Sequence, residues 1–205
     1  DYRFEPGQPA WLRAFQCAEC ADVEFRNSVF DGDRAKGVSA KEDGLGYAIG
    51  LSIRDSRGIT IEGNEFNQFI RGAVFERSQD LTIVNNDLHS LRSDGLDFAQ
   101  VKDVLIEGNY IHDFQGLPDW QDHRDMIQFW TNKTDQPTER VIIRGNILNS
   151  GMGPYTQTIF MRNEEVDTGR AEREMFYKDI EIVDNVIINA HLHGITVGET
   201  DGLVI

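Results

Sequence analysis

The sequence predicts an all-β fold, a right-handed parallel β-helix (a β-solenoid) of about seven coils with inserted loops. Three observations predict it. A short motif recurs along the 205 residues, a second apolar strand precedes each copy at a constant spacing, and helical periodicity is absent. Successive motif asparagines, such as Asn64, Asn86 and Asn109, lie 22 and 23 residues apart. Short strands repeated at this period are typical of solenoids, whose coils bury their apolar side chains against neighbouring coils.

The recurring motif places apolar residues at alternate positions and ends with a small residue or Asn, Asn, any residue and an apolar residue. Its copies are ITIEGNEF (59–66), LTIVNNDL (81–88), VLIEGNYI (104–111), VIIRGNIL (141–148), IEIVDNVI (180–187) and the degenerate VEFRNSVF (23–30). The asparagines are Asn64, Asn86, Asn109, Asn146 and Asn185. We expect them to form a structural ladder, because amide side chains bond to copies of themselves one coil away and Asn tolerates a left-handed backbone.

A second strand precedes each motif. Its copies are FQC (15–17), LSI (51–53), AVF (73–75), LDF (96–98), IQF (127–129), IFM (159–161) and ITV (195–197). In most coils six residues separate its last residue from the next motif, as from Phe75 to Leu81. Parallel stacking at about 4.8 Å with right-handed crossovers follows from this arrangement. We expect Phe75, Phe98 and Phe129 to stack inside.

The whole chain, residues 1–205, is expected to form a single β-helix domain. Each end of such a stack would expose an unpaired coil. We therefore expect the domain to form part of a longer β-helix.

Composition excludes some partners. The chain carries 35 acidic against 20 basic residues, a net charge of −15. This charge argues against a nucleic-acid partner, which needs a basic surface, and against an anionic membrane surface. No run of about 18 apolar residues occurs, so membrane insertion is not expected.

Two further features lie near the N-terminal end. Cys17 and Cys20 supply only half of a zinc site, because a second Cys pair is absent. Two buried or semi-buried thiols in a β-turn are favoured, and a short-range disulfide is the alternative. Segment 31–44 is acidic, and a solvated insertion is favoured over a Ca²⁺-binding loop.

Long insertions point to one face of the solenoid. Segments 112–125 and 149–157 precede the second strand, whereas 131–139 and 163–178 follow it. The two pairs should therefore wall a groove floored by residues 94–99, 125–130 and 157–162. Long loops in a chain whose other connections are minimal indicate function.

The groove collects polar and aromatic residues. Its floor would present Asp94, Asp97, Asp125, Gln128, Trp130 and Arg162, and its loops would bring His123, Arg124, Lys133, Tyr155, Tyr177 and Lys178. His193 stands in the column of Asp125. Carboxylates and amides bind sugar hydroxyls and indole stacks on sugar rings, so we expect a polysaccharide partner. Asp94 as a turn cap, Arg162 in a surface ion pair and His123 as a solvated residue remain alternatives.

The coil motif resembles the right-handed parallel β-helix superfamily that includes pectate lyases, alginate lyases and mannuronan C5-epimerases. The similarity covers nearly the whole chain. Those epimerases carry an Asp-Pro-His run, and the nearest stretch here is Asp122-His123-Arg124-Asp125, without the proline. The resemblance implies polysaccharide chemistry on a strand face, and we expect a secreted, cell-surface or periplasmic protein.

The chemistry shared by such lyases and epimerases is abstraction of the proton at C5 of a uronic acid. Arg162, Arg124 or Lys133 would neutralise the substrate carboxylate. His123, or His193, would be the base and Tyr155 the acid. Asp94 and Asp125 would orient the histidine or hold a Ca²⁺ ion, the one cofactor considered.

Two other functions remain open. A glycoside hydrolase would use two of the carboxylates of Asp94, Asp97 and Asp125. A structural or adhesive β-helix would bind glycans without turning them over. The sequence therefore favours an enzyme without establishing one.

Overall fold

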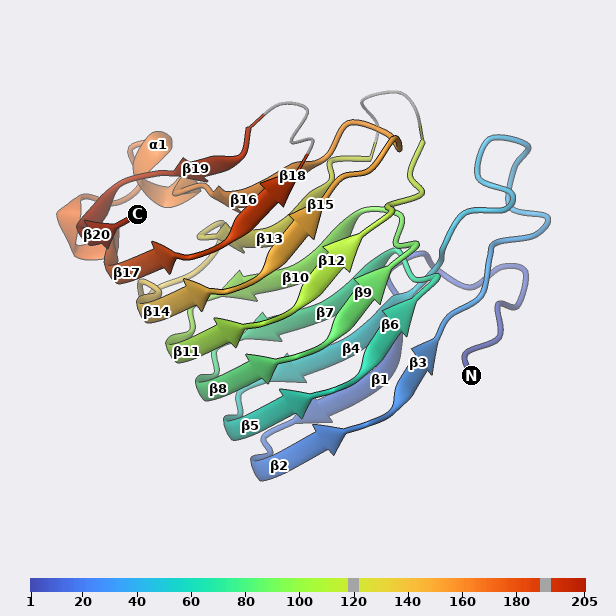
Figure 1. Cartoon of the computed structure of the whole chain (residues 1–205), viewed down its shortest axis with the longest axis horizontal. Coiled ribbons are helices and arrows are strands. Elements are labelled where there is room, and N and C mark those ends of the chain that lie inside the picture. Colours follow the sequence, from blue (N-terminus) through green and yellow to red (C-terminus); the bar gives the residue numbers. More distant parts are fainter. Residues whose placement is uncertain (118–121, 189–192) are drawn as a thin grey trace.

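The computed structural model describes residues 1–117, 122–188 and 193–205. The chain winds into a stack of coils whose strands form three parallel sheets (Figure 1). Within each sheet a strand pairs with the equivalent strands of the neighbouring coils. The predicted fold class, a right-handed parallel β-helix of about seven coils, is confirmed.

Three sheets form the sides of the solenoid. Sheet A contains β1 (Arg13–Ala18), β4 (Ile49–Arg54), β7 (Arg71–Glu76), β10 (Asp94–Ala99), β13 (Asp125–Trp130), β16 (Gln157–Met161) and β19 (Ile195–Val197). Sheet B contains β2 (Ala21–Arg26), β5 (Arg57–Glu62), β8 (Gln79–Val84), β11 (Lys102–Glu107), β14 (Glu139–Arg144), β17 (Tyr177–Val183) and β20 (Thr200–Val204). Sheet C contains β3 (Val29–Asp31), β6 (Glu65–Asn67), β9 (Asp87–His89), β12 (Tyr110–His112), β15 (Ile147–Asn149) and β18 (Val186–Ile188).

The strands of sheet A pair in the register that the repeat predicts. Asp97 pairs with Val74 on one side and with Gln128 on the other, and Gln128 pairs with Phe160. Sheet C was not predicted as a separate sheet. Its strands are only three residues long and form the last part of each motif, after the asparagine turn.

Apolar columns fill the interior. The rings of Phe75 and Phe98 stack at a centroid distance of 4.8 Å, and those of Phe98 and Phe129 at 4.7 Å. All three side chains are fully buried. Each such pair contributes about 0.5–1.5 kcal/mol beyond the burial of its area. The predicted inward stack of phenylalanines is therefore present.

The asparagine ladder runs along the turn between sheets B and C. The side-chain oxygen of Asn109 accepts hydrogen bonds from the backbone N–H and the amide group of Asn86, both at 2.9 Å. The amide of Asn109 donates to the carbonyl of Ile83 and to the side-chain oxygen of Asn146. Equivalent bonds link Asn64 to Asn86 and Asn146 to Asn185, so the ladder satisfies backbone groups in each coil.

A close backbone contact shapes the start of β4, β7 and β10, whose second residue is glycine. A Cβ atom added to Gly95 would lie 2.4 Å from the carbonyl oxygen of Met126, and one on Gly72 would lie 2.6 Å from that of Gly95. These second residues face the interior, so the first residue of each strand turns outward. Arg71 accordingly contacts both Asp94 and Asp97 on the outer face.

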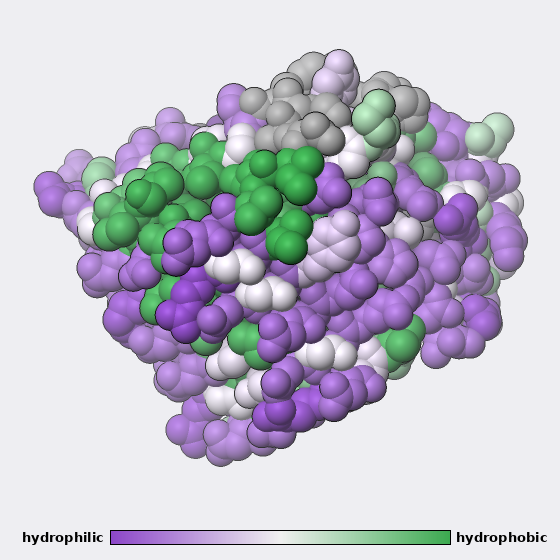
Figure 2. All heavy atoms as spheres, in the orientation of Figure 1, coloured by the Kyte–Doolittle hydropathy of each residue, from purple (hydrophilic) through white to green (hydrophobic). Residues whose placement is uncertain are grey.

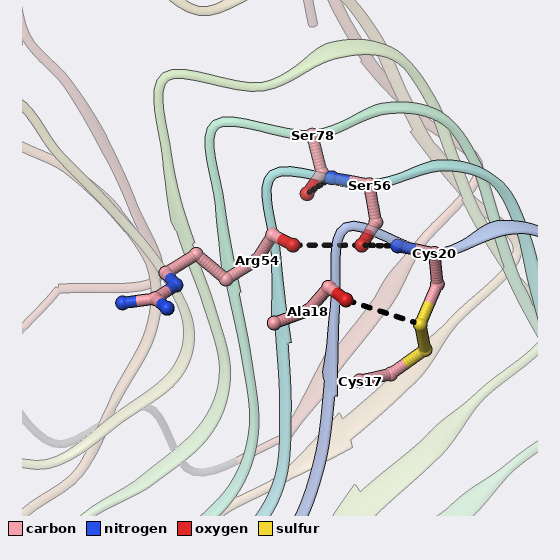
Figure 3. Close-up of a disulfide and its surroundings, with 6 residues drawn as sticks. All are labelled: Cys17, Ala18, Cys20, Arg54, Ser56 and Ser78. Atoms are coloured by element: carbon pink, nitrogen blue, oxygen red, sulfur yellow. Dashed lines mark hydrogen bonds between the residues drawn. A yellow bond between two sulfur atoms is a disulfide. The ribbon is translucent and has the colours of Figure 1, made fainter.

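Cys17 and Cys20 form a disulfide in the first coil (Figure 3), so the favoured prediction of two thiols was wrong. Their Cα atoms are 6.0 Å apart across one tight turn. The backbone N–H of Cys20 donates to the hydroxyl of Ser56, whose own N–H donates to the hydroxyl of Ser78. This turn holds the two cysteines at bonding distance, which a residue count did not reveal.

The insertions and the C-terminal end complete the molecule. One insertion contains the short helix α1 (Glu164–Asp167) and the 3-10 turn η1 (Arg173–Met175). Figure 2 shows apolar side chains gathered over the C-terminal coil, where Val186, Val204 and Ile205 are exposed. In the described part of the chain, helices of the length and apolar character needed to cross a membrane are absent.

Candidate functional site on the outer face of sheet A

The first edge of sheet A carries insertions that bind one another. Figure 1 shows long segments after β3 and β12, where the chain enters sheet A. Arg92, in the turn between β9 and β10, pairs with Asp122 at 3.0 Å and with Glu42 at 3.2 Å. Segment 31–48 therefore packs against the loop before β13 through this arginine, and the predicted solvated insertion belongs to the wall of the site.

Arg124 holds two loops of that edge together. Its side chain is buried, and it donates to the carbonyls of Leu117 at 2.6 Å and Tyr155 at 2.7 Å. A guanidinium committed to loop carbonyls is poorly placed to bind a substrate carboxylate. We therefore assign Arg124 a structural role in place of the catalytic role expected for it.

The second edge has its own network. The buried side chain of Asn163 accepts a hydrogen bond from the Thr131 hydroxyl at 3.0 Å. The backbone N–H of Lys133 donates to Glu165 at 2.8 Å. These bonds join the loop after β13 to the α1 insertion, so each pair of predicted wall loops rises from the predicted edge.

Three aspartates and one arginine form the centre of the face. Arg71 Nε lies 2.9 Å from Asp94 Oδ2, and Arg71 Nη1 lies 3.1 Å from Asp97 Oδ2. The side chain of Asp97 is fully buried, and that of Asp94 is 2% exposed. Among the described residues, neither oxygen of Asp97 accepts a well-aligned hydrogen bond. The Asp97 carboxylate is therefore balanced by its ion pair with the Arg71 guanidinium.

His123 stands at the rim of this cluster. Its Nδ1 lies 2.9 Å from Oδ2 of the fully buried Asp125, while the imidazole itself is 57% exposed. The backbone N–H of Asp125 donates to Asp94 Oδ1 at 3.1 Å. On the other side, the Gln157 amide nitrogen lies 3.1 Å from His123 Nε2. The histidine is therefore oriented from behind by a carboxylate and keeps an exposed ring.

Electrostatics couple these groups. Burial raises the pKa of Asp97 well above its usual range and raises that of Asp94, although Arg71 opposes the change at both. Burial raises the pKa of Asp125 to about 6 against the hydrogen bond from His123. The bond to Asp125 raises the pKa of His123. Strongly shifted groups in one cluster are typical of functional sites.

The other predicted residues lie farther along the face. Arg162 and Lys133 follow β16 and β13, at the opposite edge from His123, roughly 17 Å away by the rise of a six-residue strand. Arg162 pairs with Asp167 at 2.8 Å. Arg162 and Lys133 therefore lie too far from His123 to act on the same small group as the imidazole.

Gln128 and Trp130 both belong to β13. Gln128 faces outward between Asp97 and Phe160 in register. Trp130 is partly buried against the small apolar cluster of Ile49, Ile70 and Val74.

Tyr155 is exposed in the wall beside β16. His193 lies next to Gln157, two strands from Asp125, and its carbonyl accepts from Thr158. Tyr177 is buried with its hydroxyl on the Arg162 carbonyl, and Lys178 pairs with Glu139, so the structure does not bring these two to the cluster.

Three residues of the site were missed. Arg71 is the first residue of its sheet A strand, as Asp94 and Asp125 are of theirs, and this shared position could have identified it as part of the site. Gln157 shares this position. Trp11 is 54% exposed, and the Arg71 guanidinium lies 4.8 Å from the centre of its ring. The repeat does not predict a role for Trp11, because this residue precedes the first coil.

The expected Ca²⁺ site would use the carboxylates of Asp94 and Asp125. Ligand atoms of Asp94, His123 and Asp125 lie within 4.8 Å of one another. Ca²⁺ takes six to eight oxygen ligands, whereas this set includes an imidazole nitrogen. Arg71 and the Asp125 N–H already occupy the oxygens of Asp94. With Arg71 in place, these residues do not fit Ca²⁺.

Comparison with known proteins agrees with the fold. A family model described as right handed beta helix region matches residues 13–205. The chain belongs to the right-handed β-helix family. No curated protein and no solved structure matches it. The family assignment covers β1 to the C-terminal residue, and therefore includes every strand that carries the His123 cluster.

Proposed function

We propose that this β-helix protein is a polysaccharide lyase or C5-epimerase that removes the C5 proton of a uronic acid residue. One observation carries the proposal, the exposed His123 imidazole held by the buried Asp125 carboxylate. A carboxylate on Nδ1 fixes the tautomer whose Nε2 is the proton acceptor. The amide nitrogen of Gln157 faces Nε2 at 3.1 Å, and an amide nitrogen can only donate. This contact therefore agrees with the tautomer whose Nε2 is unprotonated.

The reaction can be followed through the residues. His123 Nε2 takes the C5 proton, and the Gln128 amide donates to the substrate carboxylate as charge develops on it. In a lyase the C4–O4 bond then breaks, a C4=C5 double bond forms and Tyr155 protonates the leaving oxygen. In an epimerase Tyr155 instead gives its proton to C5 from the opposite face. The open face of Trp11 supplies a stacking surface for a neighbouring sugar.

A hydrolase is the second candidate. The pKa of Asp125, raised by burial to about 6, suits a general acid. Asp97 and Asp125 are fully buried, however, and a hydrolase needs two carboxylates in contact with the sugar. The exposed histidine therefore supports the lyase or epimerase better.

Location and compartment follow the same proposal. A disulfide persists in an oxidising environment. The Cys17–Cys20 bond therefore supports a secreted, cell-surface or periplasmic protein acting outside the cytoplasm.

A substrate panel tests the function. The protein is incubated with alginate, polyglucuronate and pectate, and ultraviolet absorbance of unsaturated products is followed. Rising absorbance identifies a lyase, and solvent deuterium at C5 without absorbance identifies an epimerase. New reducing ends without unsaturation would show a hydrolase instead. Binding without turnover across a broad glycan panel would contradict an enzymatic function.

The variant His123→Ala tests the base. We expect turnover to fall by roughly 10²–10⁴-fold, the usual contribution of a general base, with the β-sheet circular dichroism unchanged. The matched control is His112→Ala, a histidine of sheet C with its own carboxylate partners Asp87 and Asp113. Equal activity of His123→Ala and wild type would remove His123 from the mechanism.

A further inference from the structure

The position of Arg71 carries a consequence for metal dependence. Its side chain is 23% exposed and lies against the carboxylates of Asp94 and Asp97, which are almost completely buried. Asp125 contributes a third buried carboxylate beside them. Three such groups face one guanidinium and one imidazole, so a full set of ionised carboxylates would exceed the positive charge. Buried carboxylates need a cation or a proton.

The carboxylate oxygens of the aspartates indicate which kind of ligand the cluster could bind. Among the described residues, neither oxygen of Asp97 accepts a well-aligned hydrogen bond, and the close partner of Asp125 is His123 Nδ1, 2.9 Å from its Oδ2. These side chains are nevertheless fully buried. Buried carboxylate oxygens with so few donors, completed by water, are the ligand type that hard divalent cations take.

We infer that the guanidinium of Arg71 occupies the position of a divalent cation in this site, so that the native protein needs no metal there. Removal of Arg71 would then convert Asp94, Asp97 and Asp125 into a divalent-cation site. A guanidinium is permanently charged and planar, so it bridges two carboxylates from a fixed direction. Trp11, stacked on its face, helps to fix that direction.

Thermal unfolding with Ca²⁺ as the probe tests the inference. Wild type, Arg71→Ala and Arg71→Ala with Asp97→Asn are stripped with EDTA and melted with and without millimolar Ca²⁺. We expect wild type to melt at the same temperature in both conditions. Arg71→Ala should melt lower in EDTA and recover as Ca²⁺ is added, since a ligand of the native state stabilises it. The double variant should not recover.

Matched controls separate this site from the acidic surface. Arg54→Ala removes another sheet A arginine, which pairs with the half-exposed Asp55 at 3.2 Å, and it should gain no Ca²⁺ response. Terbium luminescence excited through tryptophan should appear in Arg71→Ala alone. If Arg71→Ala is unfolded in EDTA, Ca²⁺ should restore its β-sheet circular dichroism.

Three results would overturn the inference. Wild type could gain stability from Ca²⁺ as the variant does, Arg71→Ala could fail to respond or refold, or its response could survive Asp97→Asn. None of these measurements uses a sugar. Their failure would leave the proposed C5 chemistry standing, and failure of the substrate panel would leave the role of Arg71 standing.

Discussion

The role proposed for His123 as a base depends on one carboxylate, that of Asp125, which contacts its Nδ1. The hydrogen bond to Asp125 raises the pKa of the imidazole, because the carboxylate stabilises its charged form. A base works only when it is unprotonated. Activity should therefore rise with pH through a value above the usual histidine pKa of about 6.5.

Asp125→Asn should move that rise to lower pH. The amide no longer stabilises the imidazolium, so the base is unprotonated at lower pH. The rate itself should fall by roughly 10²–10⁴-fold, because the imidazole loses its orienting partner. The measurement is the pH profile of kcat/KM. Asp87→Asn, which acts on His112 at 2.8 Å, is the control and should leave the profile unchanged. A rise that stays at the wild-type pH would disprove the coupling.

At the scale of elements, the asparagine ladder and the loops are stabilised by different kinds of contact. From Asn64 to Asn185 the ladder repeats one set of hydrogen bonds from coil to coil and therefore fixes the turn between sheets B and C. The loops have no repeat. Their order comes from particular contacts, such as Arg92 with Asp122 and Arg124 with the Tyr155 carbonyl.

Asn109→Ala should destabilise the protein by about 3 kcal/mol or more. The change leaves the buried N–H of Asn86 and the carbonyl of Ile83 without their partners. Chemical denaturation measures the free energy of unfolding. Asn132→Ala, in an exposed loop position, is the control and should change it little. Equal stability of the two variants would show that the ladder is dispensable.

At the scale of the molecule, stability passes from coil to coil. The strands of each coil pair only with those of the neighbouring coils, so damage to one coil should remain local. The Cys17–Cys20 disulfide closes a loop of only a few residues in the first coil. A loop that short contributes about 2 kcal/mol in the chain-entropy account.

Replacing both cysteines by serine should loosen the first coil alone. We expect amide hydrogen exchange to accelerate in β1 and β2, while β10 and β13 keep their protection. Reduction of the wild-type protein should reproduce the result. Faster exchange throughout the stack would instead show that the solenoid unfolds as one unit and that the first coil supports all the others.

The coils, the register of the strands, the inward phenylalanines, the asparagine ladder and the edges from which the loops rise can all be predicted from the amino-acid sequence. Each of these follows from a spacing that repeats along the chain, and a repeat is visible locally. The same spacing places Asp94, Asp97 and Asp125 on one face. The folded structure was needed to show that Arg71 joins them, that His123 contacts Asp125, that Arg124 binds the carbonyls of its loops and that the cysteines are bonded. These choices depend on burial and on partners from several coils, because a side chain's partner is selected by the space and charge around it and not by its position in the repeat.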